Sequence, residues 1–155
     1  MRWALLLVLV LAVSGCERRE LTYDYDTVFV RYEVRGGLVP EDRYSTEHVI
    51  DNSTVTFTRR YVNGTVSYTR SSNISKEEYV RLGTRVVDAG LFGMLDVYRP
   101  SYSSQLADRP QAEIYVNIGG RNKTVRMKPF VEEYMPGNLQ MTISEIKRHT
   151  QTLQD

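Results

Sequence analysis

Alternating apolar and polar residues run through much of the chain, and this pattern requires a fold built around a β-sheet. Successive side chains of a strand point to opposite faces, so a strand with one buried face alternates with a period of two. Residues 28–35 follow this rule, and their inward set is Val28, Val30, Tyr32 and Val34. Related patterns predict further strands over residues 44–50, 54–62, 65–70, 112–118 and 123–128.

Asn63 and Gly64 separate two of these predicted strands and indicate a β-hairpin. Asn-Gly is favoured in a two-residue type I′ turn, because both central residues of that turn need positive φ. A loop of two residues predicts two pairings across the hairpin: Tyr61 with Val66, and Arg59 with Tyr68.

Two segments have the spacing of amphipathic helices. Ser75 and Glu78 have the spacing of a capping box, and Gly90 stands where a left-handed C-cap residue belongs. Together they predict a helix of about fifteen residues. Asn138 is the expected cap of a last helix, whose narrow inward stripe is Leu139, Ile143, Ile146, Thr150 and Leu153.

The predicted order is therefore four strands, a helix, two strands and a helix. Runs of strands followed by helices favour an α+β fold with an antiparallel sheet. We expect about six strands, with both helices packed on one face of the sheet. The length of 155 residues suits a single domain.

Composition excludes several classes of function. The formal net charge of +1 argues against a nucleic-acid partner. A single cysteine allows neither an intrachain disulfide nor a Cys-based zinc site, and two histidines leave little for other metal sites. We expect no metal and no cofactor.

The N-terminus has the pattern of a targeting signal. Arg2 precedes eleven apolar residues, Trp3 to Val13, and small residues stand just before Cys16. Eleven residues are too few for a spanning helix, which needs roughly 20, but suit a secretory signal. The segment resembles a bacterial or archaeal lipoprotein signal (a lipobox). The resemblance implies cleavage after Gly15 and a diacylglyceryl group on Cys16.

This interpretation divides the chain into a signal peptide (residues 1–15), a flexible tether (residues 16–26) and one α+β domain (residues 27–155). It places the domain outside the cytoplasm, anchored to the cell membrane or envelope by lipid on Cys16. An ordinary secretory signal with an incidental cysteine, or an uncleaved anchor, is the alternative.

Four of the six asparagines stand in N-x-[ST] sequons: Asn52, Asn63, Asn73 and Asn122. All four fall at predicted turns or loop edges, where a glycan has room. Turn-forming Asn, Ser and Thr also co-occur without glycosylation. Glycans at these sites would favour an archaeal-type cell surface.

Residues 96–110 form a long segment without clear periodicity, and such segments are often functional. Arginine and tyrosine are enriched in protein interfaces, because they combine contact area with hydrogen bonds. The candidate partner-binding residues of this segment are Tyr98, Arg99, Tyr102 and Arg109.

The sequence contains no recognisable catalytic motif. His48 and Asp51 with a serine could form a triad on paper, but the nucleophile-elbow sequence G-x-S-x-G is absent. A hydrolase could use only isolated acids, of which the candidates are Glu113, Glu132 and Glu133. We therefore expect no catalytic residues and no enzymatic activity.

Several segments resemble the emfourin type of domain. They are residues 32–37 (YEVRGG), 74–78 (ISKEE), 88–92 (DAGLF) and the late β-hairpin. That family includes a small protein inhibitor of a thermolysin-like protease. The resemblance implies a binding module that inhibits or partners an exported metalloprotease. A structural, glycosylated envelope lipoprotein and an extracytoplasmic hydrolase are the alternatives.

Overall fold

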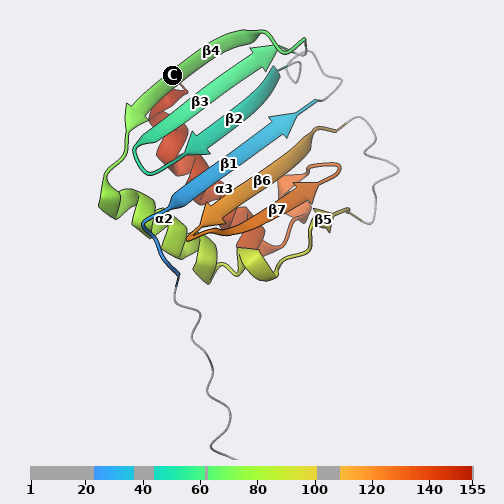
Figure 1. The fold of residues 1–155 in the computed structure, drawn as a ribbon. Helices are drawn as coiled ribbons and strands as arrows, with labels where there is room; N and C mark the ends of the chain where they lie inside the picture. Colours follow the sequence, from blue (N-terminus) through green and yellow to red (C-terminus); the bar gives the residue numbers. More distant parts are fainter. Residues whose placement is uncertain (1–22, 37–43, 62, 101–108, 155) are drawn as a thin grey trace, which may run out of the picture.

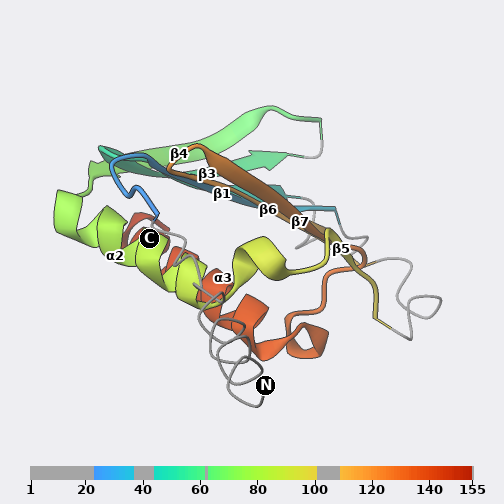
Figure 2. The same ribbon diagram turned by 60° about the horizontal axis from the view of Figure 1, so that its bottom comes forward.

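The computed structural model of the chain describes residues 23–36, 44–61, 63–100 and 109–154. The expected signal peptide, Cys16 and Tyr102 lie outside these described residues. The described chain forms one sheet with two helices on one of its faces (Figures 1 and 2). The predicted α+β class is confirmed.

The sheet has seven strands in the order β4-β3-β2-β1-β6-β7-β5. The strands are β1 (Val28–Arg35), β2 (Tyr44–Ile50), β3 (Thr54–Tyr61), β4 (Val66–Asn73), β5 (Val97–Tyr98), β6 (Gln111–Ile118) and β7 (Arg121–Met127). The helices are α2 (Lys76–Asp88) and α3 (Gly137–Thr150), with short 3-10 turns at Leu91–Gly93, Glu132–Tyr134 and Gln151–Leu153.

The expectation of about six antiparallel strands was wrong in one detail. β5 is an additional strand of two residues, and it runs parallel to β7, so the sheet is mixed. Backbone hydrogen bonds from Arg126 to Asp96 and from Lys128 to Tyr98 hold it at the edge. Two residues are too few to produce a detectable alternation, which is why the sequence pattern misses this strand.

The hairpin between β3 and β4 differs from the expected type I′ turn. Arg59 pairs with Tyr68 as predicted, but Arg60 rather than Tyr61 pairs with Val66. The N–H of Tyr61 instead donates to the carbonyl of Thr65 at 2.9 Å. Gly64 has φ +84°, and no described non-glycine residue has positive φ. The loop therefore has three residues and ends in a left-handed glycine, a form that places a bulge beside the turn.

The capping box of α2 is present, with the side chains of Ser75 and Glu78 each accepting from the other's backbone. Gly90 is left-handed as predicted, at φ +75°. Asn138 is not the N-cap of its helix, because α3 begins one residue earlier, after Pro136; its side-chain oxygen accepts from the Leu139 N–H at 3.0 Å. Its side-chain nitrogen donates to the carbonyl of Ala89 at 3.1 Å, so it satisfies the C-terminus of α2 and joins the two helices.

The core lies between the sheet and the helices. The inward residues of β1 and β6 are almost fully buried except for Val34, which is partly buried. The helices α2 and α3 cover them with Leu82, Val86, Leu139, Ile143 and Ile146. The opposite face of the sheet, here called the open face, has no described helix over it (Figure 2). Arg31, Glu113 and Arg126 form ion pairs there. An antiparallel sheet tolerates one polar face in this way.

Residues 23–26, which the sequence analysis assigned to the tether, pack on the domain. The Tyr23 ring stacks on Phe92 with centroids 5.5 Å apart, and Arg121 lies 5.0 Å from both ring centroids. Arg121 also donates to the Tyr23 hydroxyl at 2.8 Å. Lys76 forms an ion pair with Asp26 at 3.1 Å. The packed part of the chain therefore includes these four residues.

Gly119 allows this N-terminal segment to pass close to the β6–β7 turn. It has φ +57°, and an added Cβ would lie 2.6 Å from the Asp24 carbonyl oxygen. We expect Gly119→Ala to lower the free energy of unfolding by about 2–3 kcal/mol, because the residue would be strained and would clash with backbone. Urea titration measures the loss, and hydrogen exchange at Asp24 and Asp26 reports whether the segment detaches.

Gly120→Ala is the matched control. Gly120 also has positive φ, at +78°, but no atom lies within 4 Å of its added Cβ. Gly120→Ala should lower the free energy of unfolding by only about 1 kcal/mol, because it adds the backbone strain of a positive φ without a clash. Equal losses in the two variants would contradict the close approach of Asp24.

Candidate functional site

The structure brings three of the four predicted partner-binding residues to one end of the sheet. Tyr98 pairs with Met127, which pairs with Ala112, so Arg99 and Arg109 lie beyond the same row of residues. Arg99 and Arg109 are exposed. Tyr98 is half-buried against the core, and its hydroxyl accepts from the Leu95 N–H at 3.3 Å. Tyr98 therefore packs under the segment of residues 96–110 instead of being fully available to a partner.

All four sequon asparagines are exposed, but one lies inside a strand rather than at a turn or loop edge. Asn73 is the last residue of β4, and Asn122 lies in β7 opposite Asn117. The side-chain amide of Asn52 already has two hydrogen bonds. Its oxygen accepts from the Val28 N–H at 2.7 Å, and its nitrogen donates to the Asp26 carbonyl at 2.5 Å. Asn63 lies in the β3–β4 hairpin loop, where its side-chain oxygen accepts from the Thr65 N–H at 2.9 Å.

The acids and histidine considered for catalysis do not converge. Asp51 accepts hydrogen bonds from Ser53 and Thr54 in its own turn, whereas His48 bonds to Thr150. Glu113 lies on the open face, and Glu132 lies on the helix side of the sheet, paired with Lys147. Glu133 is exposed. Within the described ranges, no three His, Cys, Asp or Glu residues are grouped so that they could hold a metal ion.

A pocket of about 240 Å³ opens on the helix side of the sheet. We call it the Tyr32 pocket. It is formed by β1, β2, β3, the segment after β7 and the C-terminal part of the chain: Tyr32, Val34, Thr46, His48, Phe57, Arg59, Phe130, Lys147 and Gln154. Val34, Thr46 and Arg59 are paired neighbours in one row of the sheet, near the end of β1.

The hydroxyl of Tyr32 is the unusual feature of this pocket. Tyr32 is fully buried, and its hydroxyl has no hydrogen-bond partner among the described residues. Burial, and to a lesser extent the nearby charge of Glu132, raises the pKa of Tyr32, so the phenol stays protonated and can donate. An unsatisfied buried hydroxyl costs about 1–3 kcal/mol, and native proteins retain few such groups.

His48 lies beside Tyr32, with ring centroids 5.4 Å apart. Its Nδ1 is 2.6 Å from the Thr150 hydroxyl, which itself donates to the Lys147 carbonyl at 3.1 Å. Either atom of this short hydrogen bond can be the donor, according to the tautomer of His48. Burial, together with the charge of Lys147, lowers the pKa of His48 to about 4. His48 is therefore neutral at pH 7.

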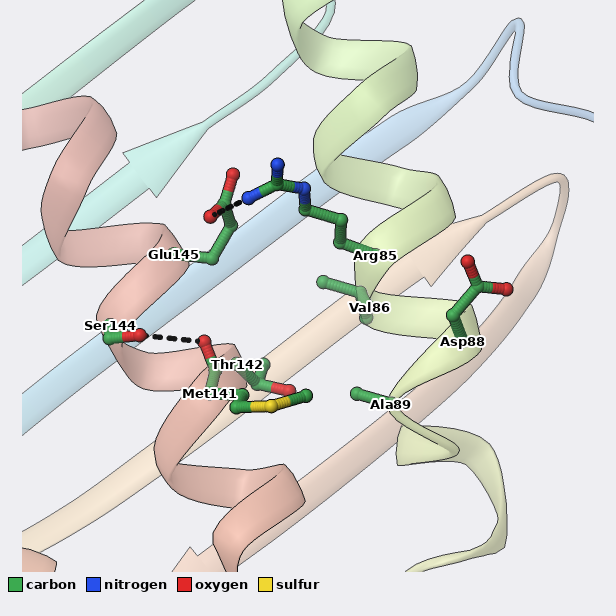
Figure 3. A pocket seen from close by; sticks show the side chains of 8 residues that line it. All are labelled: Arg85, Val86, Asp88, Ala89, Met141, Thr142, Ser144 and Glu145. Atoms are coloured by element: carbon green, nitrogen blue, oxygen red, sulfur yellow. Dashed lines mark hydrogen bonds and ion pairs between the residues drawn. The ribbon is translucent and has the colours of Figure 1, made fainter.

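A second hollow, of about 370 Å³, runs between α2 and α3 on the outer side of the helices. Figure 3 shows Arg85 reaching across it to Glu145, at 2.6 Å. Burial would raise the pKa of Glu145, but hydrogen bonds from Arg148 and Arg85 outweigh it and lower the pKa. Met141 is exposed beside this groove. None of the residues selected from the sequence lines it.

Sequence reasoning missed the Tyr32 pocket. It placed Tyr32 correctly on the inward face of β1, but inward residues are normally core. The available signal was that a tyrosine and a histidine stand opposite each other, Tyr32 against His48, among valines and isoleucines. Phe130 and Lys147 join them from parts of the chain about 100 residues away, which no local pattern reveals.

No model of a known protein family matches the chain, and no curated protein is detectably similar to it. In the part of the chain that the structure describes, none of the helices has the length and apolar character needed to cross a membrane.

Proposed function

We propose that this chain is a lipid-anchored, extracytoplasmic binding module, held to a membrane at one end and recognising a partner at the other. The observation that supports this proposal most is that the N-terminal segment and the exposed arginines lie at opposite ends of the sheet. Tyr23 and Phe92 pack beside the β6–β7 turn, where β1 begins. Arg99, Arg109 and the row containing Arg59 lie where β1 ends.

The anchor is the lipid on Cys16, as the lipobox resemblance implies. Two acyl chains hold a protein firmly to a bilayer, whereas one binds only marginally. The mature chain would have equal numbers of acidic and basic residues after loss of Arg2, so surface charge contributes little to membrane binding.

The anchor is tested by Cys16→Ser in the native host. We expect the variant to lose its lipid, to keep an uncleaved signal and to leave the normal processing route, because a hydroxyl cannot form the thioether. Mass spectrometry of the intact protein measures the change. A wild-type protein without a diacylglyceryl mass on Cys16 would rule out this anchor.

The partner that we propose is an exported protein. The emfourin resemblance makes the proposal more specific, because it implies a thermolysin-like metalloprotease. The exposed arginines at the far end of the sheet suit such a contact. The full chain at about 10 μM, far above a typical specific Kd, should inhibit hydrolysis of a peptide substrate by such a protease. Charge reversal at Arg99 and Arg109 should weaken inhibition, and Arg31→Glu on the open face is the control.

A structural, glycosylated envelope protein is the second candidate, because all four sequon asparagines are exposed. Glycopeptide mass spectrometry of the native protein separates the two candidates. Occupancy at Asn63 and Asn73 together with co-purifying envelope components would favour the structural role.

A further inference from the structure

We propose that the outer edge of β4 binds an extended segment of a partner protein, which adds a strand to the sheet and carries an acidic residue opposite Arg70. β4 and β5 form the two edges of the sheet (Figure 1). Arg99, in the candidate partner-binding segment, directly follows β5, so the β4 edge is a separate recognition surface. The inference goes beyond the proposed function, because it requires neither lipid on Cys16 nor a protease partner.

The two edges differ in how much backbone they leave unpaired. β5 has only two residues, whereas β4 has eight, and all of these except Tyr68 are exposed. From Tyr68 to Asn73 the register of β4 with β3 is unbroken, and this stretch contains no proline. Proteins usually shorten, bend or cover a free edge, because it is a template for pairing with another chain. β4 therefore keeps the geometry that an added strand needs.

The register identifies the backbone groups that β4 leaves free. The Ile74 N–H donates to the Ser53 carbonyl at 3.1 Å, and hydrogen-bonded pairs alternate along an antiparallel ladder. The even-numbered residues from 68 to 72 therefore bond to β3. The N–H and carbonyl groups of the odd-numbered residues point outward: Thr69, Ser71 and Asn73. No described strand pairs with this edge, and an extended peptide has the spacing of N–H and carbonyl groups that matches it.

The charge of Arg70 favours a partner strand with an acid. The Arg70 guanidinium lies 5.1 Å from the centre of the Tyr68 ring, and its side chain forms no ion pair or hydrogen bond with a described residue. Because the Arg70 backbone bonds to β3, Arg70 would stand in a non-hydrogen-bonded pair with the added strand, where facing side chains are closest. Opposite charges in such a pair stabilise it.

The neighbours of Arg70 define the rest of the partner strand. Tyr68 lies two residues away on the same face, and its hydroxyl donates to the Leu153 carbonyl at 2.7 Å, which holds the ring in place. A β-branched residue opposite an aromatic ring is a favourable cross-strand pair. On the open face, Thr69 and Ser71 carry hydroxyl groups, which suit threonine in the added strand. The preferred segment therefore has valines and threonines around one acid.

A second copy of this chain fits the edge less well. β4 contains no acidic residue. Two β4 strands paired about a two-fold axis would bring a second arginine to the edge and leave both charges uncompensated. A partner strand with one acid instead neutralises Arg70.

The binding test titrates the full chain in detergent with the peptide acetyl-Thr-Val-Thr-Glu-Thr-Val-Thr-amide, followed by NMR of the backbone amides. The central glutamate can stand opposite Arg70, with the valines on the same face and the threonines on the other. We expect a Kd of about 1 mM or below. At about ten times the Kd, hydrogen exchange at Thr69 and Ser71 should slow by about tenfold, because about one molecule in ten is then unbound. Ser72, whose N–H already bonds to β3, should change little.

A backbone variant tests the added ladder. Ser71→Pro removes one outward N–H and keeps the bonds to β3, since proline is tolerated on an edge strand. It should raise the Kd of the peptide by at least ~10-fold. The same peptide N-methylated at its threonines cannot donate to the edge and should not bind the wild type. This second measurement does not depend on the stability of Ser71→Pro.

A charge exchange tests the role of Arg70. Arg70→Glu should raise the Kd of the glutamate peptide by about fivefold and should lower that of the same peptide with lysine at the central position. Arg81→Glu makes the same charge change at an exposed position of α2. It should leave both Kd values unchanged.

Three results would overturn the proposal: no binding up to about 10 mM, far above the expected Kd; equal binding of the N-methylated peptide; or a Kd that does not depend on the charge opposite Arg70. Arg70 would then only protect the edge from pairing. Sedimentation of the wild-type chain without peptide tests the other occupant. A dimer that Ser71→Pro dissociates would assign the edge to a second copy and would also overturn the proposal.

Discussion

Phe57→Ala should lower the free energy of unfolding by about 3–5 kcal/mol, the range for truncating a buried phenylalanine. Phe57 is 2% exposed. Its ring packs edge-on against His48 at 5.1 Å and Tyr68 at 6.0 Å, so removing it leaves a cavity and loses two ring contacts. Urea titration followed by far-UV circular dichroism measures the loss.

The same substitution affects both the core and the Tyr32 pocket, because Phe57 belongs to both. Phe57→Leu is the control, since it keeps most of the volume and should cost about 1 kcal/mol. A loss below 1 kcal/mol in Phe57→Ala would show that the side chain is not packed as described. The pocket would then lack one of its aromatic walls.

Acidification should destabilise the domain strongly through His48. The pKa of His48 is lowered to about 4 in the folded chain, from an ordinary 6.5. The unfolded chain therefore binds more protons between pH 6.5 and 4, so stability falls as pH falls through this window and levels off below it. The difference corresponds to about 3 kcal/mol from this one residue.

His48→Gln isolates this contribution, because glutamine is neutral at every pH and can still donate toward Thr150. Wild type and variant are compared by urea titration at pH 7, 5.5 and 4. Burial also lowers the pKa of His149, and Asp51 and Glu145 have lowered pKa values, so both proteins lose stability in acid. If the wild type loses no more than the variant, His48 is not buried in the neutral form.

The features predicted correctly from the sequence are those set by neighbours along the chain. The alternation of β6 and of the first five residues of β1 places the buried residues correctly because a strand's faces depend only on odd and even positions, whereas at the end of β1 Val34 is only partly buried and Glu33 is buried. The capping box at Ser75 and the left-handed Gly90 are likewise local, since each is determined by a few adjacent residues. The class of the fold follows from the order of such elements.

The incorrect predictions concern contacts between distant parts of the chain. Asn138 was a reasonable N-cap by position, but α3 begins one residue earlier, after Pro136, and the side-chain nitrogen of Asn138 donates to the carbonyl of Ala89 at the C-terminus of α2. β5 exists only because β7 offers an edge. The Tyr32 pocket is of the same kind, because an unsatisfied hydroxyl is a property of everything that surrounds it, including Phe130 and Lys147.

The docking of residues 23–26 has a consequence for how far the domain can act from a bilayer. If Cys16 is lipidated, residues 16–22 can span at most ~25 Å, and the eight residues of β1 add about 26 Å. Arg99 and Arg109, at the end of the sheet where β1 ends, would then lie within roughly 50 Å of the lipid surface. A partner would have to come to this thin layer, where encounters occur by lateral diffusion, and a freely released partner would be captured there only while it passed close to the membrane.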